Sequence, residues 1–516
     1  MDSMCNAGRI RSQANDVGIR KIPDRACSVL PNVMHLKFLL RDEGRWRDSQ
    51  RRPVLAKPIS GNIPDRRAQT RHFKAHNAKI LHLRLHRLRQ TASRVGKVVR
   101  ENRTCLPRRM TLVPTSRSAE TASKTLVDHR PLLLRNRSPE LKEAPWWCDR
   151  NAGNDPLRLL RACPRYAPTR LISLPHMAEK LDLGEIWIKD ETQRLGIGSF
   201  KGLGGAYAVL KLAMNYVEKR TDRSILPAEL AEPGVRSMLS ELTFSCASDG
   251  NHGRSVSAGA RLIGARAVVY LHEGVSDERA AHISRLGAAI VRVAGDYNDS
   301  VEAAAKAASQ DGWIAVPDTV GPGEDATACT FVVQGYTVLI DEIIAATAGQ
   351  SKPFTHVLVQ AGVGGLAASV FGHGWARGLF GPDTHLWIVE PERSACLYES
   401  ARAKMPVRLP SGPATNMSML ECQSPSLLVW PIIQELSSGY ITVTDEEAAN
   451  AVRLLNDGVS GDQPLRVGES GAAGLAGLLR AAEEKDREGL GLDQSAKVLL
   501  FATEGPTDLS AWSGNP

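Results

Sequence analysis

Lys201 is the residue whose surroundings first indicate chemistry. It lies in Ser199-Phe200-Lys201-Gly202-Leu203-Gly204-Gly205-Ala206-Tyr207-Ala208, at the mouth of an expected helix and after the loop Gly196–Gly198. Small residues let a planar ligand approach the backbone. A lysine held there can lose its proton more easily, and its free amine can condense with an aldehyde. The alternative is a surface lysine that opens a glycine-rich helix.

A glycine turn follows later in the chain, in Gln360-Ala361-Gly362-Val363-Gly364-Gly365-Leu366. It comes after the apolar run 357–359 and opens an expected helix, so its backbone N–H groups and the helix dipole favour an anion. The turn lacks the Lys-Ser/Thr of a nucleotide P-loop and the spacing of the dinucleotide fingerprint. This pattern favours one small phosphate, with a purely structural turn as the alternative.

A third polar loop is Ser248-Asp249-Gly250-Asn251-His252-Gly253. Asn251 could donate its amide to a ring oxygen, and Asp249 could act as an acid or base. An Asx turn with a helix cap is the alternative for the same residues. We expect His252 to be structural.

From about residue 150, apolar strand-like runs alternate with helix-like runs, which predicts an α/β fold with a mostly parallel sheet. Ligands bind such sheets at the carboxyl ends of strands. Lys201, residues 249–253, residues 362–365 and Thr503-Glu504-Gly505 each follow a strand-like run. We therefore expect these loops to converge on a single site. The run 332–346 is expected to be one helix, and the stretch from about 390 to 439 irregular.

Charge divides the chain into two parts. Residues 1–150 hold 33 Lys/Arg against 13 Asp/Glu, whereas the remainder holds 32 against 43. Residues 1–125 show no lasting periodicity, which favours a disordered or spurious basic extension, with a transit peptide or nucleic-acid-binding tail as alternatives. For the catalytic region we expect neither a nucleic-acid nor a membrane partner. The 9 scattered cysteines contain no C-x-x-C pair, which favours a reducing cytoplasm and no metal site.

Together these segments resemble the fold type II pyridoxal-phosphate enzymes, over about residues 155–508. The resemblance is carried by "SFKGLGG" at Lys201, "DGNHG", "GVGG" and "TEG" at residues 503–505. Within that group the chain is most similar to the diaminopropionate ammonia-lyases, through "SDGNHGR", "FKGLGGAYAV", "PDT", "QGY", "VEPERSACLYES" and "GESGAAGLAGL". The resemblance implies two open twisted, mostly parallel sheets with flanking helices over residues 150–516, with a small domain at about 242–345.

The resemblance also implies roles for individual residues. Lys201 holds pyridoxal 5'-phosphate covalently, Asn251 contacts the ring hydroxyl, and Thr503 contacts the pyridine nitrogen. Gly362, Val363, Gly364, Gly365 and Leu366 hold the phosphate. Asp249 and Asp318 are the catalytic carboxylates, suited to the extra positive charge of a diamino acid. The implied reaction is α,β-elimination of 2,3-diaminopropionate to pyruvate and ammonia, and the implied assembly is a homodimer.

Two stretches depart from the ammonia-lyase pattern, residues 320–325 and residues 417–423, and both are expected to border the substrate pocket. These departures leave open a serine or threonine dehydratase on the same fold, or a protein that binds the cofactor without turnover. The positions Cys396 and Cys422 are similar to a cysteine pair in some members of the family, and whether they bond here stays open.

Overall fold

The computed structural model describes residues 132–134, 139–248, 250–350, 354–459, 461–483, 487 and 489–506. Two predictions fall outside these residues. One is the disordered or spurious character of residues 1–125, and the other is the catalytic role of Asp249.

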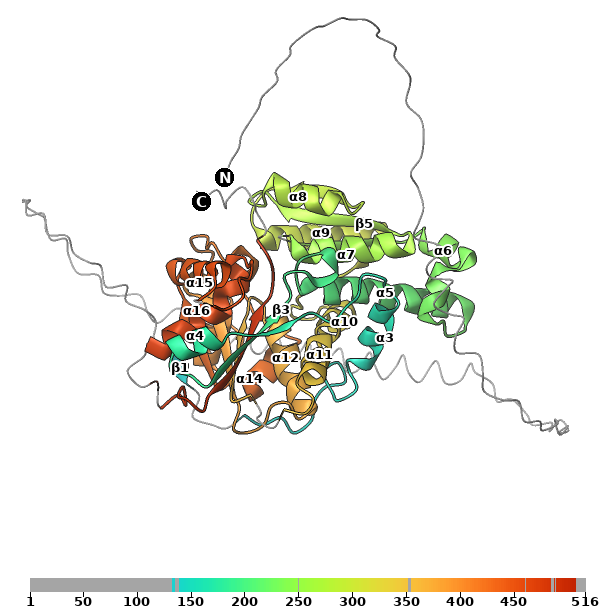
Figure 1. Ribbon diagram of the computed structural model, residues 1–516. Helices are drawn as coiled ribbons and strands as arrows, with labels where there is room; N and C mark the ends of the chain where they lie inside the picture. The colour runs from blue at the N-terminus through green and yellow to red at the C-terminus, as the bar shows by residue number, and fades with distance from the viewer. Residues whose placement is uncertain are drawn as a thin grey trace, which may run out of the picture. The chain divides into compact units, whose positions relative to one another are not determined.

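A seven-stranded sheet forms one centre of the fold (Figure 1). Its five inner strands run parallel, and the short edge strands β1 and β2 pair antiparallel with their neighbours. The order across the sheet is β1 (Leu133–Leu134), β10 (Gly439–Val443), β9 (His385–Pro391), β8 (His356–Gln360), β11 (Lys497–Ala502), β3 (Glu185–Asp190) and β2 (Leu171–Ser173).

A second sheet has four strands, all parallel. Its order is β6 (Ala289–Val293), β5 (Arg266–His272), β4 (Thr243–Ala247) and β7 (Ile314–Ala315). Two mostly parallel sheets with flanking helices confirm the expected fold class. All four strands fall within residues 242–345, although the boundaries of the small domain stay a prediction.

Helices connect the strands, as parallel pairing requires. α7, α8 and α9 accompany the four-stranded sheet, and α15 and α16 lie beside the seven-stranded one (Figure 1). The helices are α3 (Asn154–Arg161), α4 (Pro175–Lys180), α5 (Lys201–Thr221), α6 (Pro233–Leu239), α7 (Asn251–Ile263), α8 (Asp277–Ser284), α9 (Tyr297–Asp311), α10 (Thr327–Tyr336), α11 (Val338–Ala346), α12 (Gly365–Ala376), α13 (Cys396–Ala403), α14 (Trp430–Leu436), α15 (Asp445–Asp457) and α16 (Glu469–Glu483).

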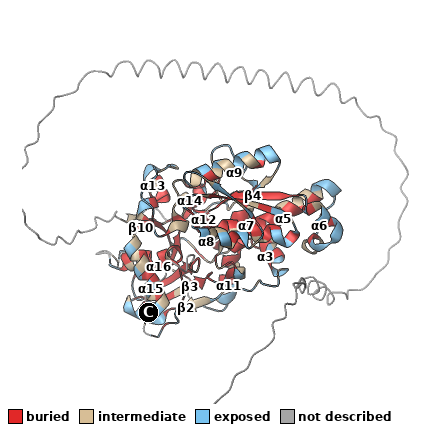
Figure 2. Cartoon of the chain, turned by 90° about the horizontal axis from the view of Figure 1, so that it is seen from above, coloured by how far each residue is buried: buried red, intermediate tan, exposed pale blue. Residues whose placement is uncertain are grey.

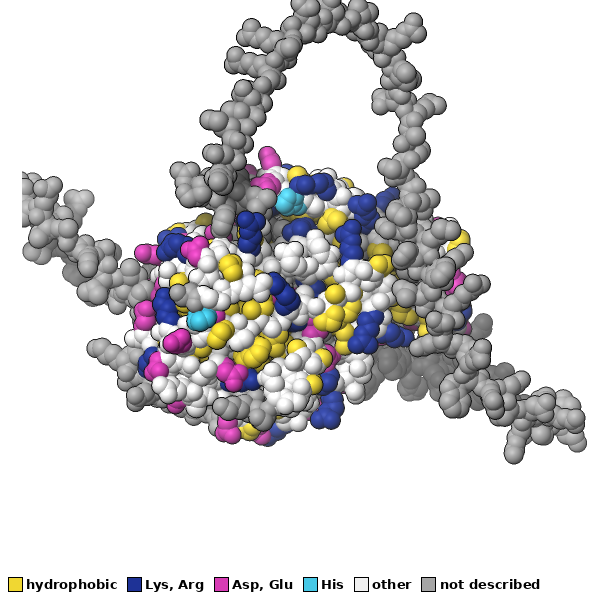
Figure 3. Space-filling model, viewed as in Figure 1, with side chains coloured by type: hydrophobic (Ala, Val, Ile, Leu, Met, Phe, Trp, Pro, Cys, Tyr) yellow, Lys and Arg dark blue, Asp and Glu magenta, His cyan; other side chains and the backbone are white. Residues whose placement is uncertain are grey.

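Strands β4, β8, β10 and β11 are buried along their whole length, and helices such as α9 and α15 have an exposed face (Figure 2). Glycines let α5 and α7 cross closely. A Cβ on Gly259 would lie 2.9 Å from the Cα of Ala206, and one on Gly205 would lie 2.8 Å from Ser255 Oγ. Close packing at this crossing fixes the start of α5, where Lys201 lies. On the face seen in Figure 3, acidic and basic side chains are interspersed.

The structure differs from expectation in two places. The expected helix 332–346 is two helices, since α10 ends at Tyr336 and α11 begins at Val338. Between them, the backbone N–H and the hydroxyl of Thr337 both donate to the Gln334 carbonyl oxygen, at 3.1 and 2.6 Å. The stretch expected to be irregular contains α13 and α14. The segment Thr327–Ala346 is long and apolar enough to cross a membrane, but 78% of its most apolar window is buried inside the protein.

Candidate active site

One pocket is lined by residues that follow strands of both sheets. Lys201 comes after β3, Asn251 after β4, and Asp318 after β7. The turn 362–366 follows β8, and Thr503 follows β11. The structure therefore brings together every described residue that the sequence predicted for the site.

Lys201 and Asp318 form an ion pair in this pocket, with Lys201 Nζ 2.6 Å from Asp318 Oδ2. Burial opposes the charge on Lys201, but attraction to Asp318 outweighs it and raises the lysine pKa above its usual range. Burial likewise opposes the charge of Asp318. The positive charge of Lys201 nonetheless holds the pKa of Asp318 well below its usual range. The expected easier loss of the lysine proton is therefore not found here, because a carboxylate faces the amine.

The turn after β8 has the form of an anion cradle. Gly364 takes the left-handed conformation with φ +97°, and a Cβ there would collide with Ile433. A Cβ on Gly362 would lie 2.7 Å from Cys422 Sγ. α12 begins at Gly365, and the first N–H groups of a helix have no acceptor within the helix. Glycine is thus required for the turn that presents these donors to the pocket.

Asn251 and Thr503 lie at two further corners of the pocket. Asn251 is the first residue of α7, and its side-chain Nδ2 donates to Glu504 Oε2. The preceding turn is fixed by Ser248, whose Oγ accepts from the N–H groups of Gly250 and Gly253 at 3.0 and 2.8 Å. The hydroxyl oxygen of Thr503 accepts from Gln360 Nε2 at 3.1 Å, so its own proton can be donated elsewhere.

Three buried polar atoms of the pocket residues have no hydrogen-bond partner within the described part of the chain. They are Tyr336 Oη, Gln360 Oε1 and His252 Nδ1. His252 Nε2 lies 2.7 Å from the Val316 carbonyl oxygen, and burial lowers the histidine pKa, so the ring is neutral. Buried polar groups are normally paired. Three unpaired polar atoms in one pocket therefore indicate that the pocket receives a polar ligand.

Several pocket residues were not predicted from the sequence. The phenol of Tyr297 donates to Asp318 Oδ1 at 3.3 Å, and Tyr336 and Glu504 also line the pocket. Tyr297 gave no local signal, whereas Glu504 lay inside the quoted "TEG" segment without an assigned role. Of the two departing stretches, residues 417–423 contribute lining residues and residues 320–325 do not.

The cysteines noted from the sequence lie at the edge of this site. The structure has Cys396 and Cys422 as thiols and not as a disulfide. Cys396 Sγ lies 3.6 Å from the Gly362 carbonyl oxygen. Burial raises the pKa of the Cys396 thiol well above its usual value, which makes it a poor nucleophile.

A buried ion cluster, formed by Lys189, Glu191, Arg194 and Glu342, underlies the loop that leads to Lys201. Arg194 Nη2 lies 2.7 Å from Glu342 Oε2, and Lys189 Nζ lies 2.6 Å from the same oxygen. Arg194 Nε also donates to Glu191 Oε2 at 2.7 Å. Two cations and two carboxylates balance, and each is almost inaccessible to solvent.

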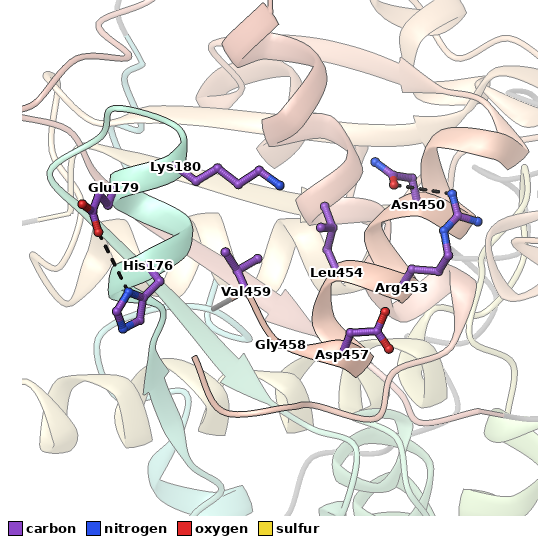
Figure 4. A pocket seen from close by; sticks show the side chains of 9 residues that line it. All are labelled: His176, Glu179, Lys180, Asn450, Arg453, Leu454, Asp457, Gly458 and Val459. Carbon is purple, nitrogen blue, oxygen red and sulfur yellow. Dashed lines mark hydrogen bonds and ion pairs between the residues drawn. The ribbon is translucent and has the colours of Figure 1, made fainter. Parts of the chain in front are cut away.

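A second hollow lies between α4 and α15 and shares no lining residue with the site (Figure 4). Lys180 extends across it, His176 lies near Glu179, and Arg453 contacts Asn450 (Figure 4). None of the described residues that the sequence predicted for the site lines this hollow.

Comparison with known proteins agrees with this geometry. Residues 163–503 match the family model described as "Pyridoxal-phosphate dependent enzyme". The chain belongs to this family. Its cofactor is therefore pyridoxal phosphate, as the motif resemblance implied.

Two relatives and one solved structure show where the chain lies within the family. It is 36% identical to a diaminopropionate ammonia-lyase of Salmonella typhimurium, over 69% of this chain and 90% of the relative. It is 34% identical to that of Escherichia coli strain K12, over 68% and 88% of the two chains. The crystal structure of the Escherichia coli enzyme with an aminoacrylate–PLP azomethine intermediate superposes with a TM-score of 0.65, at 30% identity and over 74% and 97% of the chains.

Proposed function

We propose that the protein catalyses the α,β-elimination of 2,3-diaminopropionate, which with one water gives pyruvate and two ammonia molecules. The observation that carries the proposal is the pocket in which the Lys201–Asp318 ion pair lies with a glycine turn at the start of α12. The 34–36% identity to diaminopropionate ammonia-lyases supports the choice of substrate.

The residues present fit pyridoxal phosphate. A lysine amine suits its aldehyde, the glycine turn suits its phosphate, and unpartnered buried polar atoms suit a polar ligand. Lys201 would hold the cofactor through Nζ, and residues 362–366 would hold the phosphate. Asn251 would contact the ring hydroxyl, and Thr503 would donate its hydroxyl proton to the ring nitrogen.

The bound cofactor withdraws electrons from the α-carbon of an amino acid, which acidifies the α-proton. Lys201 Nζ would accept that proton from one enantiomer of the substrate, and Asp249 would accept it from the other. A neutral hydroxyl at Thr503, in place of a carboxylate, weakens electron withdrawal and favours rapid loss of a β-substituent.

Asp318 would bind the β-ammonium group of the substrate. Its low pKa keeps it a carboxylate at neutral pH, so it favours the protonated β-amine, which departs as neutral ammonia when the Cβ–N bond breaks. Serine and threonine carry no such charge. The pocket therefore favours a diamino acid over a hydroxy amino acid.

We also propose that the protein works as a homodimer in the cytoplasm, without a nucleic-acid or membrane partner for its catalytic region. The family resemblance supports the dimer, and the cysteine pattern supports a reducing compartment. Light scattering on the purified protein tests the dimer, and a monomeric mass at working concentration would reject it.

The test of function is steady-state release of ammonia and pyruvate from D- and L-diaminopropionate, compared with serine and threonine. We expect a higher kcat/KM for diaminopropionate, and Lys201→Ala should abolish both release and the visible absorption of the bound cofactor. A higher kcat/KM for serine or threonine would replace this proposal by a dehydratase. Cofactor absorption without any release would indicate a protein that binds the cofactor but does not turn over.

A further inference from the structure

Glu504 is a buried acid of the site to which no role has been assigned. It follows Thr503 beyond the end of β11, is 4% exposed, and lines the same pocket as Lys201. Its backbone forms an isolated bridge with Ser199, so its position is fixed relative to the lysine loop. Its side-chain Oε2 accepts a hydrogen bond from Asn251 Nδ2.

The amide of Asn251 has only one suitable orientation. Arg254 Nη1 lies 3.4 Å from Asn251 Oδ1, so the amide oxygen faces the guanidinium and the amide nitrogen faces the carboxylate. An amide nitrogen carries two N–H donors. Glu504 accepts one of them, which leaves the second available to the pocket.

The surroundings of Glu504 place its ionisation near neutral pH. Burial raises its pKa to about 7, against the opposing effect of nearby cations and of the Asn251 hydrogen bond. The charged groups that act on it come from four helices: Lys201 of α5, Arg254 of α7, Arg279 of α8 and Glu469 of α16.

We propose that Glu504 is a positioning residue that holds one N–H of Asn251 and thereby directs the other N–H to the ring hydroxyl of the cofactor. This inference rests on the proposed function, because it requires that Asn251 contacts the cofactor. A carboxylate accepts a stronger hydrogen bond than a neutral acid. Asn251 is therefore held more firmly as the pH rises through about 7, where Glu504 becomes charged.

The experiment compares the dissociation constant of pyridoxal phosphate at pH 6 and pH 8, followed by fluorescence and visible absorption, in the full-length protein. Glu504→Gln keeps an acceptor but cannot become charged, and Glu504→Ala removes the acceptor. Glu302→Gln is the matched control, because Glu302 is an exposed carboxylate on α9.

At pH 6 the acid is mostly protonated, so the Glu504→Gln and wild-type proteins should bind the cofactor about equally. At pH 8 the Gln variant should bind several-fold more weakly, and the Ala variant should bind roughly tenfold more weakly at both pH values. Glu302→Gln should match wild type throughout.

The inference is overturned if the ratio of the dissociation constants of the Glu504→Gln and wild-type proteins is the same at pH 6 and pH 8. It is also overturned if the Glu504→Ala protein binds pyridoxal phosphate as tightly as wild type. Glu469→Gln adds an independent check, because the negative charge of Glu469 raises the pKa of Glu504. In this variant the pH-dependent gain in cofactor affinity should occur at lower pH than in wild type. Failure of the wild-type protein to bind pyridoxal phosphate at all would instead reject the proposed function.

Discussion

Substitution of Glu342 by Gln is the most direct test of the buried ion cluster. Glu342 Oε2 accepts from Lys189 Nζ at 2.6 Å and from Arg194 Nη2 at 2.7 Å, and Tyr166 donates to Oε1 at 2.9 Å. Glutamine has nearly the same shape but no charge. It would leave two buried cations facing the single carboxylate of Glu191.

The magnitude follows from the pKa of Glu342. Burial opposes its charge, yet Arg194 and Lys189 lower the pKa from 4.5 to about 2. That difference corresponds to roughly 3 kcal/mol of folding free energy. Because the folded-state pKa is lowered, this contribution is present above pH 4.5 and is lost as the pH falls through 2. Leaving an unpaired buried charge costs roughly 3–5 kcal/mol, so the two arguments agree.

The assay is urea denaturation at pH 7.5. We expect Glu342→Gln to lower the free energy of unfolding by roughly 3 kcal/mol, and Glu302→Gln to change it by less than about 0.5 kcal/mol. Lys189→Met should also destabilise the protein, since it leaves an excess negative charge. The double variant Lys189→Met/Glu342→Gln restores the charge balance and should lose less than the sum of the two single losses.

Two results would refute this reasoning. One is a Glu342→Gln protein within about 0.5 kcal/mol of wild type at pH 7.5. The other is strict additivity in the double variant, which would show that the two residues do not interact energetically.

Further expectations concern the turn, the ion pair and a buried histidine. Gly364 has φ +97°, and Gly364→Ala also places a Cβ against Ile433, so this variant should bind pyridoxal phosphate roughly tenfold more weakly in a fluorescence titration. Gly381→Ala is the control, because Gly381 has open space around it and its substitution should not weaken binding. Asp318→Asn removes the carboxylate that keeps Lys201 protonated, so the rate of cofactor attachment, followed by stopped-flow absorption, should reach its plateau at lower pH than in wild type. Burial lowers the pKa of His356 from 6.5 to about 4, so its neutral form is favoured in the folded state and stability falls as the pH drops from 6.5 towards 4. Thermal melting of His356→Gln over that range should show a smaller loss than wild type, and an equal loss would contradict the assignment.

Local patterns predicted much of the fold. The helix expected to begin at Lys201 is α5, which does begin there and ends at Thr221. α15 begins with a capping box in Thr444-Asp445-Glu446-Glu447, where the Thr444 hydroxyl oxygen accepts from the Glu447 N–H. Such features depend on neighbouring residues, so the sequence displays them directly. By contrast, β10 was missed, because its Gly439 and Thr442 dilute the apolar signal of a strand that is buried only by its tertiary neighbours.

The site divides in the same way. Lys201 and the glycines of the 362–366 turn were visible because each belongs to a short motif. The contact between Asn251 and Glu504 joins residues 253 apart, and the bond between Arg194 and Glu342 joins residues 148 apart. No local pattern encodes such pairs. The charge of Lys201 was mispredicted for the same reason, since the carboxylate that raises its pKa lies 117 residues away.

Two contacts in the pocket, Lys201–Asp318 and Asn251–Glu504, also join the two sheets. Lys201 and Glu504 belong to segments tied to each other, since Phe200 N–H donates to the Thr503 carbonyl oxygen at 3.0 Å and Gly505 N–H donates to that of Gly198 at 3.1 Å. Their partners Asp318 and Asn251 follow strands of the four-stranded sheet. A substrate ammonium that binds Asp318 competes with Lys201 for the same carboxylate, whereas the Asn251–Glu504 contact is not contested in this way. Substrate binding should therefore free the Lys201 amine for proton transfer, while the Asn251–Glu504 contact continues to hold the two sheets together.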